Sequence, residues 1–130
     1  YYVFEMYRGH MGAQLASMHI RCDDLRVPSR NQPASMFGLS GSASVKNKLL
    51  TVTLTNPSLD ASVLARIRLT SGSVVDGRGM LLTHPDMTAT NSFDHPNEVR
   101  LAPIPVSVRN KGTEVSIPPR AVVSLQLQMA

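Results

Sequence analysis

Short runs in which aliphatic or β-branched residues alternate with polar ones constrain the fold of this chain more than any other feature. Leu50, Val52 and Leu54 fall on one face of residues 50–55, and three threonines fall on the other. The same period of two, in some cases weaker, recurs at residues 16–22, 37–45, 63–70, 104–108, 115–117 and 123–128. A period of two is typical of β-strands with one buried face. These runs therefore predict half-buried strands.

Turn-forming residues separate the runs. The turn signals are Asn47-Lys48, Asn56-Pro57, Ser71-Gly72, Asp76-Gly77, Lys111-Gly112 and Pro118-Pro119. Many short strands with turns between them, and no helical pattern in between, are typical of β-sandwiches and jelly rolls. The chain is therefore predicted to be all-β, as a jelly-roll-like antiparallel β-sandwich.

The first dozen residues differ from the rest because their apolar positions follow a helical spacing. The residues on this stripe are Val3, Phe4, Met6, Tyr7 and His10. Glycines at positions 9 and 12 supply two possible helix ends. The pattern predicts a short helix within residues 1–12, followed by a sandwich domain over residues 13–130.

Charge and composition argue against several classes of protein. The chain has 13 Lys and Arg residues and 9 Asp and Glu residues, which gives a net charge of +4. The basic residues are dispersed and are not interleaved with aromatic residues, so binding to nucleic acid is not expected. No apolar stretch approaches the ~20 residues that a membrane-spanning helix requires, so a membrane location is not expected. The single cysteine, Cys22, allows no internal disulfide, and this mildly favours a reducing compartment such as the cytoplasm.

Four histidines were considered as metal ligands, at His10, His19, His84 and His95. The last two flank a polar stretch that contains Asp86 and Asp94. A metal site is one interpretation of this stretch, and a loop whose side chains bond to their own backbone is the other. We favour the second, and we expect Phe93 to be buried beneath such a loop.

The sequence offers no set of catalytic residues. It contains no Gly-x-Ser-x-Gly motif, no phosphate-binding loop and no dinucleotide fingerprint. Asp23 and Asp24 are neighbours that would point to opposite faces of a strand. Cys22 continues an alternating apolar run and is expected to be a small buried residue rather than a nucleophile. The residues therefore predict no catalytic, substrate-binding or metal-binding residue and no cofactor.

Three stretches resemble α-L-arabinofuranosidases of glycoside hydrolase family 51. Residues 2–10 (YVFEMYRGH) resemble the end of that family's last barrel helix. Residues 82–99 (LTHPDMTATNSFDHPNEV) resemble a segment of its C-terminal domain, and residues 117–125 (IPPRAVVSL) resemble its closing strand. His84, Arg100 and Leu101 depart from the pattern, but they affect only loop detail.

The resemblance implies a jelly-roll domain that follows a catalytic (β/α)8 barrel. In that family two glutamates of the barrel catalyse hydrolysis with retention of configuration, and neither glutamate motif occurs in this chain. Residues 1–12 would be the end of the last barrel helix, and sequence from before the barrel would contribute strands to the sandwich. The implied role is to pack on the barrel of an enzyme that removes arabinofuranosyl side chains from arabinan or arabinoxylan. We expect a homo-oligomer. The alternative is an autonomous carbohydrate-binding module, although the chain has no Trp and few aromatic residues for stacking on sugars.

Overall fold

A computed structural model describes residues 1–109 and 111–130 as a β-sandwich with one short helical segment at the N-terminus. The elements of this part of the chain are α1 (Tyr2–Tyr7), the 3-10 helix η1 (Arg8–His10), β1 (Gln14–Leu15), β2 (Leu25–Val27), β3 (Ala34–Met36), β4 (Ser40–Lys46), β5 (Leu49–Asn56), β6 (Val63–Arg68), β7 (Val74–Thr83), β8 (Ala102–Ile104), β9 (Ser107–Arg109), β10 (Gly112–Ile117) and β11 (Ala121–Met129). Among the described helices, none is long and apolar enough to cross a membrane.

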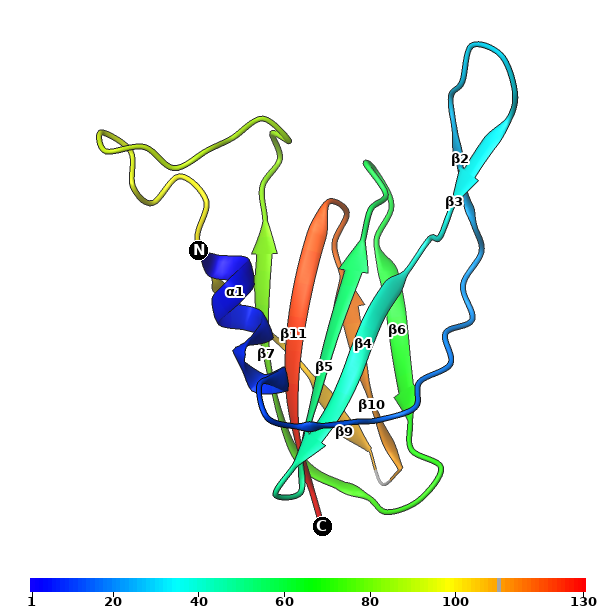
Figure 1. Cartoon of the computed structure of the whole chain (residues 1–130), viewed down its shortest axis with the longest axis vertical. Helices are drawn as coiled ribbons and strands as arrows, with labels where there is room; N and C mark the ends of the chain where they lie inside the picture. The colour runs from blue at the N-terminus through cyan, green and yellow to red at the C-terminus, as the bar shows by residue number, and fades with distance from the viewer. Residues whose placement is uncertain (110) are drawn as a thin grey trace.

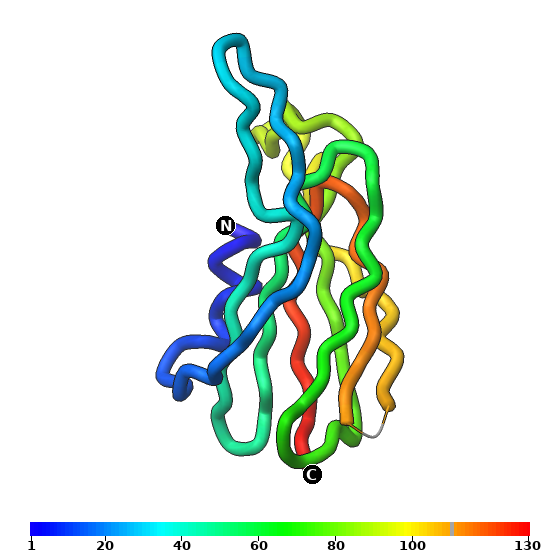
Figure 2. The backbone as a smooth tube through the Cα atoms, turned by 90° about the vertical axis from the view of Figure 1, so that its right-hand side faces the viewer, coloured from blue at the N-terminus to red at the C-terminus, as the bar shows by residue number. Residues whose placement is uncertain are grey.

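Two antiparallel sheets form the sandwich. The larger sheet has the strand order β1-β4-β5-β11-β7-β8, and the smaller sheet has the order β6-β10-β9. Figure 1 shows α1 in front of the larger sheet and the smaller sheet behind it, and Figure 2 shows the same layers from the side. A hairpin of β2 and β3 projects beyond one end of the sheets. The prediction of an all-β antiparallel sandwich with a short N-terminal helix is confirmed.

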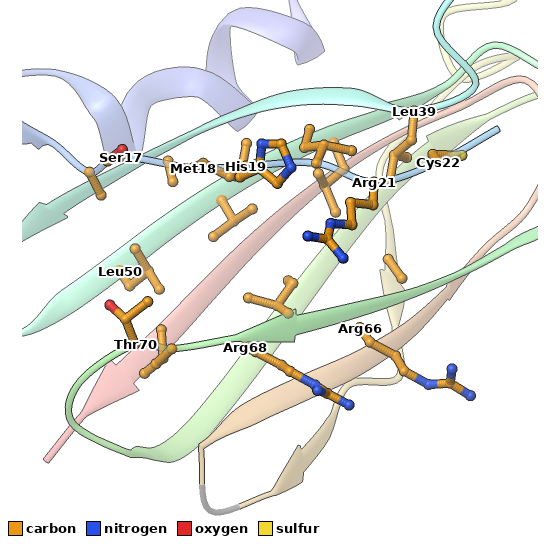
Figure 3. Close-up of a pocket in the computed structure, with 18 of the residues that line it drawn as sticks. Ser17, Met18, His19, Arg21, Cys22, Leu39, Leu50, Arg66, Arg68 and Thr70 are labelled. Atoms are coloured by element: carbon orange, nitrogen blue, oxygen red, sulfur yellow. The ribbon is translucent and has the colours of Figure 1, made fainter. Parts of the chain in front are cut away.

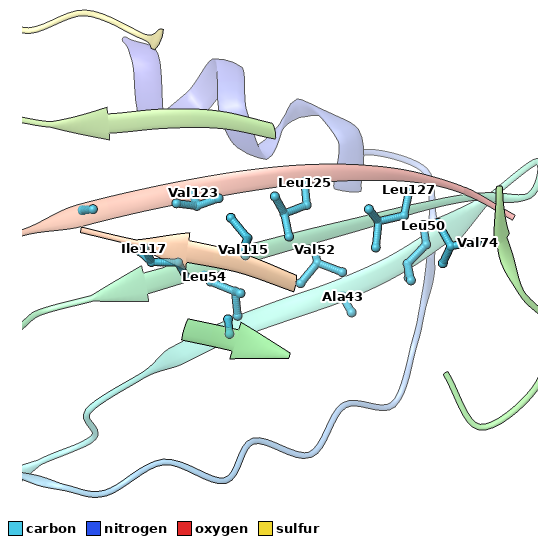
Figure 4. Packing of buried hydrophobic residues seen from close by; sticks show 12 residues of the cluster. Ala43, Leu50, Val52, Leu54, Val74, Val115, Ile117, Val123, Leu125 and Leu127 are labelled. Atoms are coloured by element: carbon cyan, nitrogen blue, oxygen red, sulfur yellow. The ribbon is translucent and has the colours of Figure 1, made fainter. Parts of the chain in front are cut away.

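The core lies between the two sheets (Figure 4). The alternating run in β11 supplies its centre, since Val123, Leu125 and Leu127 have no exposed surface. Val115 and Ile117 of β10 face them from the smaller sheet. Burying an aliphatic side chain of this size contributes about 1.5–3 kcal/mol. The sequence pattern identified these residues correctly.

Strand β5 differs from the prediction because both of its faces are buried. Leu50, Val52 and Leu54 face the core as expected, but Thr51 and Thr53 are only 2% and 0% exposed. The helical segment lies over these threonines. A Cβ atom on Gly9 would come within 2.7 Å of Thr51 Oγ1, so only glycine allows this close approach. The period of two predicted the strand, whereas the cover on its second face comes from residues about 40 positions away.

Two turn signals have opposite outcomes. Asn47 and Lys48 connect β4 and β5 with φ angles of 51° and 61°, as a two-residue hairpin turn of type I′ requires. Asp76-Gly77 is not a turn, because both residues lie inside β7. A Cβ atom on Gly77 would lie 3.2 Å from both Val106 and Val108. The glycine leaves room for these side chains of the neighbouring segment.

The predicted strand at residues 16–22 is also wrong. The pairing of β1 with β4 ends soon after Leu15, with a hydrogen bond from the Ala16 N–H to the Ala43 carbonyl. The chain then runs without strand pairing to β2, and Cys22 is exposed. Ala16 and Ile20 still pack against the core. The alternation therefore reflects contact with the core without a strand.

Candidate functional site

His10 joins the helical segment to the larger sheet. It is the last residue of η1, and its side chain places Nδ1 2.6 Å from Ser44 Oγ and Nε2 3.1 Å from Thr53 Oγ1. Ser42 Oγ is 2.9 Å from the same threonine oxygen and 3.5 Å from Nε2. Burial lowers the pKa of His10 from its ordinary value of 6.5, because a partly desolvated ring favours the neutral form. We call these four residues the His10 cluster.

A serine beside a histidine could in principle be an activated nucleophile. Ser44, however, is only 5% exposed beneath the helical segment, so a substrate could not reach its hydroxyl. The second ring nitrogen of His10 contacts a threonine hydroxyl and not an orienting carboxylate. The His10 cluster therefore attaches the helical segment to the sheet. No local sequence pattern indicates this contact, because His10 and Ser44 are 34 positions apart.

Residues 84–101, between β7 and β8, form a loop that is held by its own side chains; we call it the 84–101 loop. Asp86 Oδ1 accepts hydrogen bonds from the hydroxyl and the N–H of Thr88, at 2.7 and 2.8 Å, and these lower the pKa of Asp86. The Asn91 side chain makes two 2.7 Å hydrogen bonds to the backbone of Val99. Ser92 Oγ accepts the N–H of His95. The interpretation of this stretch as a self-bonded loop is confirmed.

The base of the loop is fixed to its neighbours. His84 Nε2 lies 3.3 Å from Glu98 Oε1, which joins the two ends of the loop. Arg120, in the turn between β10 and β11, donates hydrogen bonds to the carbonyls of His84 and Leu59. Arg120 has a φ angle of 54°, which is uncommon for a residue with a side chain.

Phe93 contradicts the expectation that it is buried beneath this loop. Its exposed fraction is 106%, so no part of the chain covers the ring. The expectation failed because polar hydrogen bonds alone order the loop, and it needs no apolar plug. The phenylalanine is therefore free to face outward.

Acidic and metal-binding side chains form no cluster in the described residues. No group of three His, Cys, Asp or Glu residues there could hold a metal ion. Glu114 instead lies between two arginines, 3.4 Å from Arg66 Nε and 3.7 Å from Arg109 Nη2.

A groove of about 910 Å³ lies between residues 16–22 and β6 (Figure 3). Its floor is apolar and includes Leu50, while Arg21 and Arg68 lie at its sides. Among the described residues, no tyrosine or phenylalanine lines it. The exposed phenylalanines are dispersed instead, since Phe4 lies on α1, Phe37 lies between β3 and β4, and Phe93 lies in the 84–101 loop. The groove thus offers no aromatic platform for stacking on sugars.

Comparison with known proteins identifies relatives of this chain. Residues 1–121 match the family model for the α-L-arabinofuranosidase C-terminal domain. An intracellular exo-α-L-arabinofuranosidase from Bacteroides ovatus is 32% identical over 129 residues. That match covers 98% of this chain but only 25% of the relative, so the chain spans about a quarter of the relative's length.

Solved structures agree on the fold. The family 51 arabinofuranosidase from Xanthomonas axonopodis pv. citri superposes with a TM-score of 0.86 and 23% identity, over 97% of this chain and 25% of that one. The α-L-arabinofuranosidase from Thermotoga maritima gives a TM-score of 0.71 and 19% identity, over 86% of this chain and 25% of that one. Taken with the match over residues 1–121, these findings show that the chain belongs to the α-L-arabinofuranosidase C-terminal domain family.

Proposed function

We propose that this chain is the non-catalytic β-sandwich domain of a retaining α-L-arabinofuranosidase, and that it packs on and stabilises the catalytic barrel. The parent enzyme would remove arabinofuranosyl side chains from arabinan or arabinoxylan. In this proposal residues 1–12 are the end of the last barrel helix, and residues 13–130 are the sandwich. The catalytic carboxylates would then lie outside this chain.

The observation that carries the proposal is that residues 1–12 expose large apolar side chains on the side away from the larger sheet. Met6 is buried against the larger sheet. On the other side Val3, Phe4 and Met11 are 45%, 84% and 73% exposed. Large apolar side chains that stand together on a surface are typical of a contact site. The relatives, about four times the length of the chain, would supply the missing cover from their catalytic part.

The groove in Figure 3 fits the expectation that another segment of the parent chain completes the sandwich. Strand β6 is the edge of the smaller sheet, so one side of its backbone lacks a strand partner. An open edge of this kind readily accepts a further strand. The apolar floor of the groove would cover the inward side chains of that strand.

Activity and binding assays test the proposal. The 130-residue chain should release no nitrophenol from a nitrophenyl arabinofuranoside, whereas the longer parent chain should be active. Turnover by the short chain that is lost on Asp86→Asn or Asp94→Asn would contradict it. Titration with arabinan and xylan examines the alternative, a carbohydrate-binding module. Saturable binding to either polysaccharide by the short chain would favour that alternative.

Two further parts of the proposal concern assembly and location. We place the protein in the cytoplasm as a homo-oligomer, since the exposed thiol of Cys22 fits a reducing compartment and the exposed stripe and open edge favour association. Cell fractionation and light scattering of the parent chain are the corresponding measurements.

A further inference from the structure

The 84–101 loop presents apolar side chains that the described part of the chain leaves largely exposed. Phe93 is fully exposed and Met87 is 66% exposed. Most aromatic side chains in a folded domain bury part of their ring, because doing so removes a large apolar area from water. A phenylalanine held entirely in water therefore indicates a surface that binds something else.

The loop holds Phe93 in place before any partner arrives. The Asn91 side chain closes the segment that contains Phe93 with two 2.7 Å hydrogen bonds to Val99, and Ser92 caps the N–H of His95. The His84–Glu98 pair and the hydrogen bond from Arg120 to the His84 carbonyl fix the base. A loop ordered in advance loses little entropy on binding, and an aromatic side chain on it is suited to act as an anchor.

The loop begins where β7 ends, and α1 packs against β7 and β11. In Figure 1 residues 84–101 extend past the N-terminus of α1, beyond the end of β7. Phe37, which is 75% exposed, is placed differently, because the segment between β3 and β4 lies on the opposite side of the sheet in the same view. A partner that packs at the N-terminal end of α1 would therefore be close to the loop, whereas Phe37 follows the β2–β3 hairpin.

We propose that Phe93 is a second anchor for the catalytic part of the same polypeptide and that it inserts into an apolar recess on that part. This inference rests on the proposed function, in which α1 makes the first contact. The catalytic part is the occupant we choose because the family relatives carry about three-quarters of their length outside the matched region. A second copy of the chain is the competing occupant that the experiment addresses.

The test compares three single substitutions in the 130-residue chain and in the longer parent chain that includes the catalytic part. Phe93→Ser removes the proposed anchor, Phe4→Ser alters the first contact, and Phe37→Ser is the matched control at another exposed phenylalanine. We expect Phe93→Ser to lower the melting temperature of the parent chain by about 2 °C or more, as loss of a buried aromatic anchor should. We expect it to leave the melting temperature of the short chain unchanged, because its ring has no contact there. Phe37→Ser should be neutral in both chains.

Each other outcome has a distinct meaning. If Phe4→Ser destabilises the parent chain and Phe93→Ser does not, the proposal that Phe93 is an anchor is wrong. The proposed packing of the domain on the barrel would still hold. If neither substitution destabilises the parent chain, the packing role fails as well. If Phe93→Ser converts a dimer of the short chain to a monomer in light scattering, the occupant is a second copy and the inference is overturned.

Discussion

Asn56 shows at the scale of a single residue how the turns at one end of the sandwich are held. Its side chain has no exposed surface, and its Nδ2 donates to the carbonyls of Ala61, Ile117 and Pro118 at 2.9–3.2 Å. Its Oδ1 accepts the N–H of Ser58. One amide thus joins the turn after β5 to the turn after β10. The sequence indicated a turn at Asn56-Pro57 but not the second segment that the amide binds.

Replacing Asn56 by alanine should destabilise the fold strongly. The change leaves buried carbonyl groups and one N–H without partners, and each such group costs about 1–3 kcal/mol. We expect the free energy of unfolding to fall by about 3 kcal/mol in urea titrations. Asn31→Ala, at an exposed position in the β2–β3 hairpin, is the control and should change little. A change of similar size in both variants would contradict this account.

The His10 cluster predicts a dependence of stability on pH. Because burial lowers the pKa of His10, the unfolded chain binds its proton more readily than the folded chain does. The contribution of the cluster is complete above the unfolded pKa of about 6.5 and is lost as the pH falls through the folded pKa. We expect the urea concentration at the unfolding midpoint to decrease when the pH is lowered from 7.5 to 5. The decrease should be smaller in His10→Gln. Equal changes in the two proteins would show that other groups cause the effect.

At the scale of the element, β7 depends on glycines where its neighbours come close. A Cβ atom on Gly79 would lie 2.5 Å from Ile104 Cγ2 and 3.0 Å from Val106 Cγ2. Gly77 makes a similar approach to Val106 and Val108. The segment of β8 and β9 joins the larger sheet to the smaller one. The two glycines let this segment cross close over β7.

We therefore expect Gly79→Ala to destabilise the domain by about 1–3 kcal/mol, because the added methyl group overpacks this crossing. Val75→Ala on the same strand is the control, since Val75 is 59% exposed and should cost under about 0.5 kcal/mol. Thermal melts of the two variants provide the measurement. Equal melting temperatures would mean that the β8–β9 segment moves to accept the methyl group without loss of stability.

At the scale of the whole molecule, the helical segment is a third layer on the sandwich. It packs on the larger sheet, with Met6 buried and Ser124 Oγ donating a 3.0 Å hydrogen bond to the Met6 carbonyl. The outward stripe stays exposed at the same time, so packing on the sheet leaves room for a partner.

A chain that begins at Ala13 should be less stable than the 130-residue chain. Loss of residues 1–12 uncovers Thr51 and Thr53, and it removes the contacts of Met6 and His10. We expect a lower melting temperature, with burial of Met6 alone contributing about 1.5–3 kcal/mol. We also expect the longer chain, but not the shorter, to self-associate at high concentration in light scattering. Identical melting and identical mass in the two chains would show that the segment neither stabilises nor associates.

Local pattern alone determined the positions of the main strands, the turn at Asn47-Lys48 and the self-bonded loop after His84. These features depend on neighbours in sequence, since a period of two reports that adjacent side chains meet different surroundings. Tertiary structure alone decided what those surroundings are. It buried Thr53 beneath a helical segment, placed Gly77 under Val106 instead of in a turn, exposed Cys22 and left Phe93 in water. Each of these outcomes depends on segments far apart in the chain, and no local pattern carries that information.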